Sequence, residues 1–297
     1  MVGIVAEYNP FHNGHIRQIN WIKQNFPNEK IVVVMSDKFS QRGEYTITSF
    51  FKRKQIAKKY GVSKVIKLSF EQSVQAAHIF AYNAIMRLNQ VGVDKIVFGS
   101  ESNDVQQMID LATYLNNHLD LFNQHIRYFL KKEKLAYPKA FALALKQISG
   151  KNYTLPNDIL GFEYVKTIIN NNLNIKIFSI KRNIDFHSQL TLNQYASASL
   201  LRQKIKKNED ISHYSPMKIK KGRFIENDYL KFKKILLSTP LTKLKKIQLI
   251  SEGIENLFLK NIYHSNYDDF IQACVSKRYT ASRIKRIYAW ILNKKWK

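Results

Sequence analysis

Short apolar runs alternate with helical spacings of apolar residues through the first hundred positions of the chain. The runs at residues 2–6, 31–35, 64–68 and 95–98 are short and rich in β-branched residues, which predicts buried strands. Between them, apolar residues recur every three or four positions, as on one face of a helix. A later run at residues 175–180 predicts a fifth strand. This alternation predicts an α/β fold, a Rossmann-like parallel five-stranded sheet with helices on both faces.

The pattern changes in the last third of the chain. Residues 104–147 and a stretch from about residue 159 already carry helical spacings, but they stand between predicted strands. From about residue 208 the strand patterns disappear, and lysine clusters accompany helical spacings. We therefore predict two domains: an α/β domain at residues 1–207 and a mostly helical, basic domain at residues 208–297.

Charge adds a candidate partner to this picture. The chain holds 48 Lys and Arg against 22 Asp and Glu, a formal net charge of +26. Residues 203–297 alone carry 22 basic and 8 acidic side chains, net +14. Such an excess favours a polyanionic partner, nucleic acid before membrane, because no amphipathic anchor or long apolar run is present. The alternative is a lysine-rich solvated surface without a partner.

Cysteine content bears on the compartment. The single cysteine, Cys274, excludes a disulfide framework and a cysteine-based zinc site within one chain. A reducing cytoplasm fits this composition, and the start of the chain has no secretory signal pattern.

The loop at residues 7–15 is the strongest candidate for chemistry. It follows the first predicted strand and precedes a helical pattern, so it places a helix N-terminus at the carboxyl edge of the sheet. The free N–H groups and the dipole of such a helix favour an anion. His12 and His15, in the pattern His-x-Gly-His, can donate to phosphate oxygens, and Gly14 lets a ligand lie close. The alternative is a polar loop with two unremarkable histidines.

Several motifs in chain order resemble the bacterial tRNA(Met) cytidine acetate ligase family of the nucleotidyltransferase superfamily. They lie at residues 5–15, 35–36, 41–44, 98–101, 156–161, 181–182, 196–202 and 277–280. The resemblance implies a nucleotidyltransferase-type fold and an ATP-dependent enzyme that activates acetate as acetyl-adenylate. It implies transfer of the acetyl group to N4 of the wobble cytidine of elongator tRNA(Met).

The resemblance also implies the site residues. His12 and His15 would act on the phosphates, and ATP would be bound by Glu7, Tyr8, Asn9, Pro10, Phe11, His12, Asn13, Gly14, His15, Gly99, Asn157, Arg182, Ser197, Ser199 and Arg202. Mg²⁺ would bridge the phosphates through their own oxygens, with few protein ligands. The residues expected to meet the RNA or acceptor are Gln41, Arg42, Glu44, Lys277, Arg278, Arg283, Lys285 and Arg286. The last five interleave with aromatic residues that could stack on unpaired bases.

Other interpretations stay open. Arg182 could pair with a surface carboxylate, Gly99 could be an ordinary turn and Asn157 an ordinary helix cap. Tyr288 and Trp290 could belong to the core of an amphipathic helix. The chain departs from the family pattern at Asp37, Tyr45, Phe186 and Ser188, chiefly on the acceptor side. The competing hypotheses are a nucleotidyltransferase that adenylylates a small metabolite and a non-catalytic RNA-binding protein.

Overall fold

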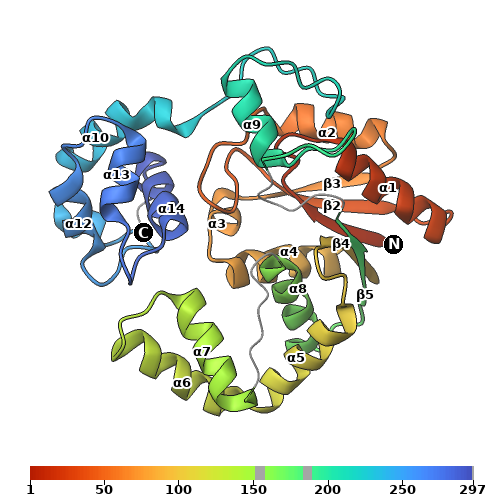
Figure 1. Cartoon of the computed structure of the whole chain (residues 1–297), viewed down its shortest axis with the longest axis horizontal. Helices are drawn as coiled ribbons and strands as arrows, with labels where there is room; N and C mark the ends of the chain where they lie inside the picture. Colours follow the sequence, from red (N-terminus) through yellow and green to blue (C-terminus); the bar gives the residue numbers. More distant parts are fainter. Residues whose placement is uncertain (151–157, 183–188, 296–297) are drawn as a thin grey trace.

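One parallel sheet of five strands organises the first part of the molecule (Figure 1). This computed structural model describes residues 1–150, 158–182 and 189–295. The strands are β1 (Val2–Ala6), β2 (Ile31–Ser36), β3 (Lys64–Leu68), β4 (Lys95–Ser100) and β5 (Lys176–Lys181), in the spatial order β3-β2-β1-β4-β5. Every pair is parallel, with Ile4 opposite Val33 and Val97 opposite Phe178. The predicted five-stranded parallel sheet is confirmed.

Helices cover both faces of the sheet, which explains the continuous apolar strands. Alternate side chains of β2 point to opposite faces: Val33 packs with α1 (Asn13–Asn25) and α2 (Phe50–Lys59), whereas Val32 and Val34 pack with the opposite helices. Those opposite helices are α4 (Ala77–Asn89), α5 (Val105–Asn117) and α8 (Ile159–Asn170). All six residues of β2 are therefore buried.

The strand order sets the position of the candidate site. From β1 the chain builds toward β2 and β3 on one side, and then crosses to β4 and β5 on the other. The carboxyl ends of β1 and β4 thus border the point where the direction of winding reverses, which is where such sheets bind ligands. The loop at residues 7–12 and the loop at residues 101–104 both start there.

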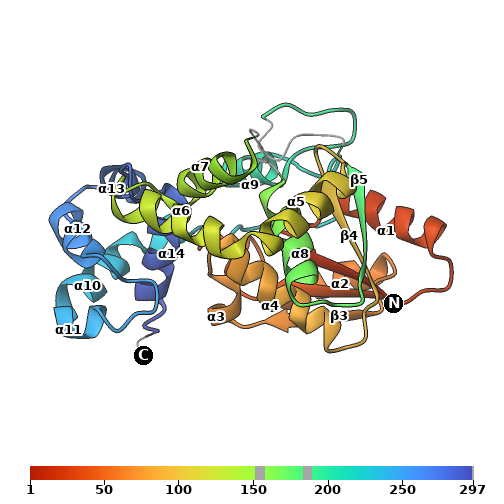
Figure 2. The same ribbon diagram turned by 90° about the horizontal axis from the view of Figure 1, so that it is seen from below.

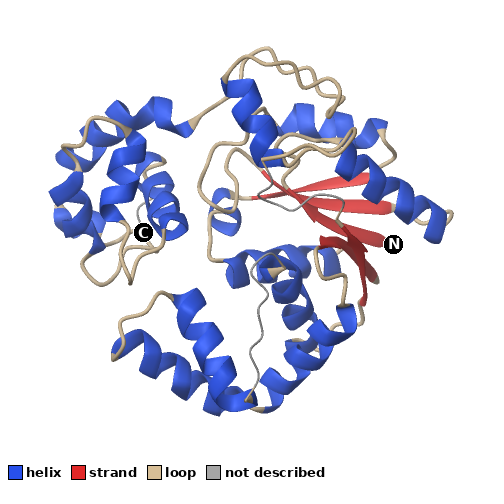
Figure 3. Cartoon of the chain, viewed as in Figure 1, coloured by secondary structure: helices blue, strands red, loops and turns tan. Residues whose placement is uncertain are grey.

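The remaining helices form two groups outside this sheet. Helices α6 (Leu119–Lys131) and α7 (Tyr137–Ser149) pair with each other and extend toward the C-terminal helices (Figure 2). The C-terminal part contains helices only among its described residues (Figure 3). Its elements are η1 (Ile225–Asp228), α10 (Tyr229–Ser238), α11 (Leu241–Leu244), α12 (Ile254–Asn261), α13 (Tyr267–Cys274) and α14 (Ala281–Leu292). Two further short helices, α3 (Phe70–Ser73) and α9 (Ala198–Lys206), belong to the first part.

Aromatic residues of α14 form the core of the C-terminal part. Tyr288 is fully buried and stacks on Phe232 of α10 at 4.0 Å between ring centroids. Trp290 is also buried, and its indole N–H donates to the carbonyl of Val74 at 2.9 Å. The interpretation of Tyr288 and Trp290 as core residues is therefore confirmed, and neither is available to stack on a base.

The segment after α9 packs on the first part of the molecule. Ile211, Tyr214 and Phe224 contact a small core around Ile47 and Leu201, and Met217 joins the core beneath α1. The core of the C-terminal helices takes its residues from Ile225 onward, together with Phe39 and Val74 of the first part. The division at residues 207 and 208 remains a prediction, and these contacts support a boundary nearer residue 225. In the described chain, no helix is long and apolar enough to cross a membrane.

Candidate active site

His12 and His15 form a reciprocal cap at the start of α1. The Nδ1 atom of His12 accepts from the N–H of Gly14, and the Nδ1 atom of His15 accepts from the N–H of His12, both at 3.1 Å. The two rings stack with their centroids 3.8 Å apart. Because each Nδ1 accepts a hydrogen bond, each neutral ring carries its proton on Nε2. The cap therefore leaves two Nε2–H groups as possible donors to an anion.

Gly14 is required by the His12 ring. A Cβ at this position would lie 2.9 Å from Cε1 and 3.1 Å from Nδ1 of His12. The sequence interpretation attributed the glycine to close approach of a ligand. The structure adds a nearer reason, which is that the capping imidazole lies directly against the Gly14 backbone.

Two buried aromatic side chains hold His15 in place. The Tyr8 ring meets His15 edge-on at 4.8 Å between centroids, and the Phe11 ring stacks on it at 5.5 Å. Both aromatic residues are almost completely buried. They therefore orient a histidine from the core side, and His15 itself remains partly exposed.

Burial and positive neighbours keep both histidines neutral. Burial lowers the pKa of His12 to about 4, with smaller contributions from Arg182 and Arg202. Burial also lowers the pKa of His15 far below its usual value, helped by His12 and Arg182. An anion placed among these groups would oppose both causes. The pair thus forms a neutral donor set inside a positive surrounding.

The backbone of the loop is fixed by residues far along the chain. Asn9 accepts from the N–H of Ile47 at 2.7 Å, and its carbonyl accepts from Arg202 at 3.0 Å. Asn13 donates to the carbonyls of Gln194 and His213 at 2.8 and 3.0 Å. Each asparagine therefore helps to fix the conformation of the loop at residues 7–15.

A second group of predicted residues meets at the carboxyl ends of β4 and β5. The Nε atom of Arg182 donates to the carbonyl of Gly99 at 3.3 Å, and a Cβ on Gly99 would lie 3.4 Å from that Nε. The Asp158 carboxylate accepts from the N–H groups of Glu101 and Ser102, at 2.8 and 3.0 Å. This holds the loop after β4 next to Arg182. Asn157 lies outside the described residues, as do the departures at Phe186 and Ser188.

The residues of the segment at 196–202 have two different roles: Ser197 caps a helix, whereas Ser199 and Arg202 line a pocket. Ser197 is buried and caps α9, because its Oγ accepts from the N–H of Leu200 at 3.1 Å. Ser199 and Arg202 line a pocket of about 260 Å³ together with Glu44 and Lys285. Arg202 thus lies between the loop of His12 and this pocket.

The loop at residues 41–44 joins the site to α14. Gln41 donates its N–H to the Glu7 carboxylate at 2.6 Å, and burial raises the pKa of that carboxyl. Glu44 accepts from Lys285 of α14 at 2.7 Å and lies 3.8 Å from Arg202. Gly43 has φ of +85°, and a Cβ there would lie 2.6 Å from the carbonyl oxygen of Lys285. This loop therefore contacts the ATP-binding candidates on one side and the helical part on the other.

Arg53 is a structural member of the site that the sequence analysis missed. It is fully buried in α2 and donates to the carbonyls of Glu7 at 2.6 Å, Ser36 at 3.0 Å and Asp37. The carboxyl ends of β1 and β2 are thereby tied to one guanidinium. Arg53 lies three residues after Phe50 and four before Ala57, so the spacing in the sequence places it on the apolar face of the helix. That spacing could have indicated that Arg53 is buried.

Most of the basic residues predicted to meet RNA already have protein partners. Arg278 and Arg283 both pair with Glu252, at 2.8 and 3.2 Å. Arg286 is partly buried near Gly43, and burial lowers its pKa to about 10. Lys277 is exposed and forms no ion pair with any described residue. Its neighbourhood is the strongest remaining candidate for an external anion.

The described residues contain no group of three or more His, Cys, Asp or Glu that could hold a metal ion. The expected Mg²⁺, bound mainly through phosphate oxygens, therefore remains a prediction.

A family model described as HIGH Nucleotidyl Transferase matches residues 1–296. This match fits both the parallel sheet and the His12–His15 cap at its carboxyl edge. The fold and the site thus define a nucleotidyl transferase of the HIGH type.

Similar proteins give a narrower assignment. The tRNA(Met) cytidine acetate ligase of Mycoplasmopsis synoviae is 53% identical over 297 residues, covering 99% of this chain and 96% of that protein. The enzyme of the same name from Mycoplasmopsis pulmonis is 47% identical and covers 98% of each chain. The chain belongs to the tRNA(Met) cytidine acetate ligase family.

Two solved structures agree. Thermotoga maritima TmcAL in its apo form I matches with a TM-score of 0.90 and 28% identity, over 100% of this chain and 76% of that chain. The form II structure bound with alpha-thio ATP matches with a TM-score of 0.85 over 75% of its chain. The resemblance found in the sequence is thereby confirmed.

Proposed function

We propose that this chain uses ATP to activate acetate and transfers the acetyl group to N4 of the wobble cytidine of elongator tRNA(Met). The observation that carries the proposal is the reciprocal histidine cap, which leaves two neutral Nε2–H donors at the carboxyl edge of the sheet. The relatives named for this reaction and the Thermotoga structure with alpha-thio ATP support the same substrates.

The first step forms acetyl-adenylate. A carboxylate oxygen of acetate attacks the α-phosphorus of ATP, and the bond to the bridging oxygen breaks to release pyrophosphate. The protein needs no nucleophile of its own for this step, because positioning and charge stabilisation lower the barrier. We assign phosphate contacts to the Nε2–H groups of His12 and His15 and to the N-terminus of α1.

Two arginines complete the proposed phosphate site. Arg182 reaches the loop after β4, and Arg202 reaches the loop at residues 7–15, so they approach the two histidines from different elements. Both contribute positive charge at His12. Their guanidinium groups can bind the oxygens that gain charge as pyrophosphate leaves.

The second step transfers the acetyl group. The N4 amine of the cytidine attacks the acetyl carbonyl carbon, the bond to the adenylate oxygen breaks, and AMP leaves as the amine loses a proton. The loop at residues 41–44 lies between the ATP-binding candidates and α14, so we place the acceptor base near Gln41 and Arg42. A cytoplasmic location remains the prediction of the sequence.

The decisive test is transfer of labelled acetate to purified tRNA, with and without ATP, followed by nucleoside analysis. We expect label in an acetylated cytidine only when ATP is present. ATP-dependent adenylylation of a small metabolite, without labelled RNA, would favour the metabolite enzyme instead. RNA binding without any consumption of ATP would favour the non-catalytic binding protein.

A further inference from the structure

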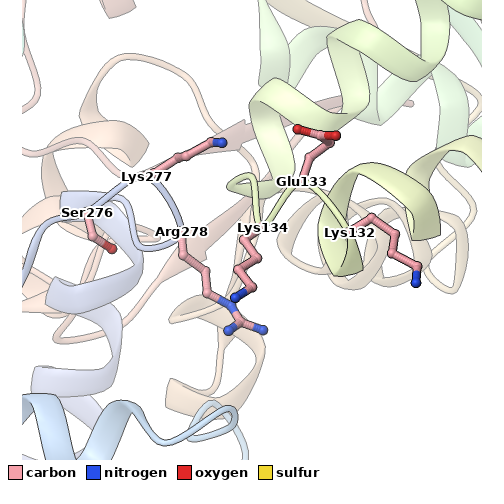
Figure 4. Close-up of a pocket in the computed structure, with 6 residues that line it drawn as sticks. All are labelled: Lys132, Glu133, Lys134, Ser276, Lys277 and Arg278. Carbon is pink, nitrogen blue, oxygen red and sulfur yellow. The ribbon is translucent and has the colours of Figure 1, made fainter.

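A seam between two distant segments forms a basic pocket on the surface. We call the residues Lys132, Lys134, Lys277 and Arg278 the basic seam. They line an open pocket of about 500 Å³ together with Glu133 and Ser276 (Figure 4). The first two follow α6, and the last two lie between α13 and α14.

A backbone hydrogen bond holds the two sides of the seam together. The N–H of Ala136, at the start of α7, donates to the carbonyl of Lys277 at 3.0 Å. Leu135, next to it, is buried, which anchors the turn in the core. The pocket is thus built from ordered backbone on both sides, and its lysines occupy defined positions on it.

Three of the four basic side chains of the seam have no ion-pair partner among the residues that the structure describes. Lys132, Lys134 and Lys277 are exposed and form no ion pair among residues 1–150, 158–182 and 189–295. Arg278 shares the single carboxylate of Glu252 with Arg283. Figure 4 shows Lys134 and Arg278 pointing in the same direction from opposite sides of the seam. Like charges brought together in this way favour an anion from outside.

We propose that the basic seam binds the sugar–phosphate backbone of the RNA substrate, an inference that rests on the proposed function. The lining residues are four basic residues, one acidic residue and one serine. That composition suits contacts to phosphate oxygens rather than to an apolar protein surface. The RNA would thereby bridge α6 and α7 to the C-terminal helices, and reach beyond Arg283 of α14, which Glu252 already holds.

The test compares two double charge reversals by tRNA binding at several salt concentrations. Lys134→Glu/Lys277→Glu removes charge from the seam. Lys30→Glu/Lys64→Glu makes the same change in net charge elsewhere. These two exposed lysines lie at the amino ends of β2 and β3, at the edge of the sheet opposite the ATP loop. All four side chains are exposed, and thermal unfolding checks that both variants fold.

We expect the seam variant to bind tRNA at least about tenfold more weakly and the control to stay within about threefold of the unchanged protein. A neutral variant, Lys134→Gln/Lys277→Gln, should lower the slope of log K against log salt by about 1.5. Equal losses in the seam variant and its control, or unchanged binding by the seam variant, would overturn the proposal.

Acetate-dependent exchange of pyrophosphate into ATP, measured without RNA, separates this proposal from the proposed function. The seam variant should retain full exchange, because its charges lie away from the ATP loop. If the unchanged protein shows no exchange, the proposed function fails, and the seam is then judged by the binding measurement alone.

Discussion

The loop at residues 7–15 and the segment at residues 276–286 both carry charged or titratable side chains, but they use them differently. In the loop, hydrogen bonds from four distant segments fix the backbone, and two histidines remain as neutral donors. In the later segment, Glu252 and Glu44 take up three of the five basic side chains. A polar residue is therefore available for a ligand when the fold leaves its atoms unpaired, and residue type alone does not decide this.

The largest expected effect is that of His15→Ala. The change removes one Nε2–H donor and the acceptor for the His12 N–H, so acetate-dependent pyrophosphate exchange should fall by about 10²–10³-fold. His118→Ala, an exposed histidine after α5, is the matched control and should change little. Near-normal exchange by the folded His15 variant would remove the central role of the cap.

Arg53→Met tests how the loop is held. The change leaves one buried and two partly buried carbonyl groups without their donor, so the free energy of unfolding should fall by about 2–4 kcal/mol. Urea denaturation measures this loss. Lys52→Met, an exposed position on the same helix, should change stability by less than about 0.5 kcal/mol. Similar values for both variants would mean that Arg53 does not hold the strand ends.

A pH titration tests the neutral state of His12. Its pKa is about 4 in the fold against 6.5 in an unfolded chain, so the unfolded state binds the proton first as the pH falls. Stability should therefore drop between pH 7 and pH 5.5, with about 1 kcal/mol of that drop due to His12. His12→Asn keeps a capping acceptor without titrating in this range, and it should lose correspondingly less. Parallel curves for the two proteins would contradict the lowered pKa.

The smallest effect concerns the connection between the two regions. Glu44→Gln weakens the contacts to Lys285 and Arg202 but keeps the shape of the side chain, and partial exposure limits the loss. Acetyl transfer to tRNA should fall about threefold to fivefold, with a smaller change in pyrophosphate exchange. Glu209→Gln, which breaks an exposed pair with Lys204, is the control and should leave both rates unchanged.

The sequence was sufficient for the fold and the family because both depend on local, ordered patterns. Strand runs, turn residues and the His-x-Gly-His spacing are visible within a few positions. The roles of Ser197 and Lys285 depend instead on which group each one meets in space. Ser197 caps its own helix, and Lys285 meets a glutamate 241 residues away. Arg53 was missed because a basic residue on an apolar helix face is normally expected at the surface.

The long-range anchors of the loop at residues 7–15 have a consequence for synthesis on the ribosome. Ser215 donates to the carbonyl of Phe11, Met217 accepts from its N–H, and Arg202 donates to Asn9. The residues of the ATP loop are made first, yet the groups that shape them emerge about two hundred residues later. The first four strands of the sheet, which end at Ser100, emerge well before these anchors, so the active site is among the last features of the α/β part to mature.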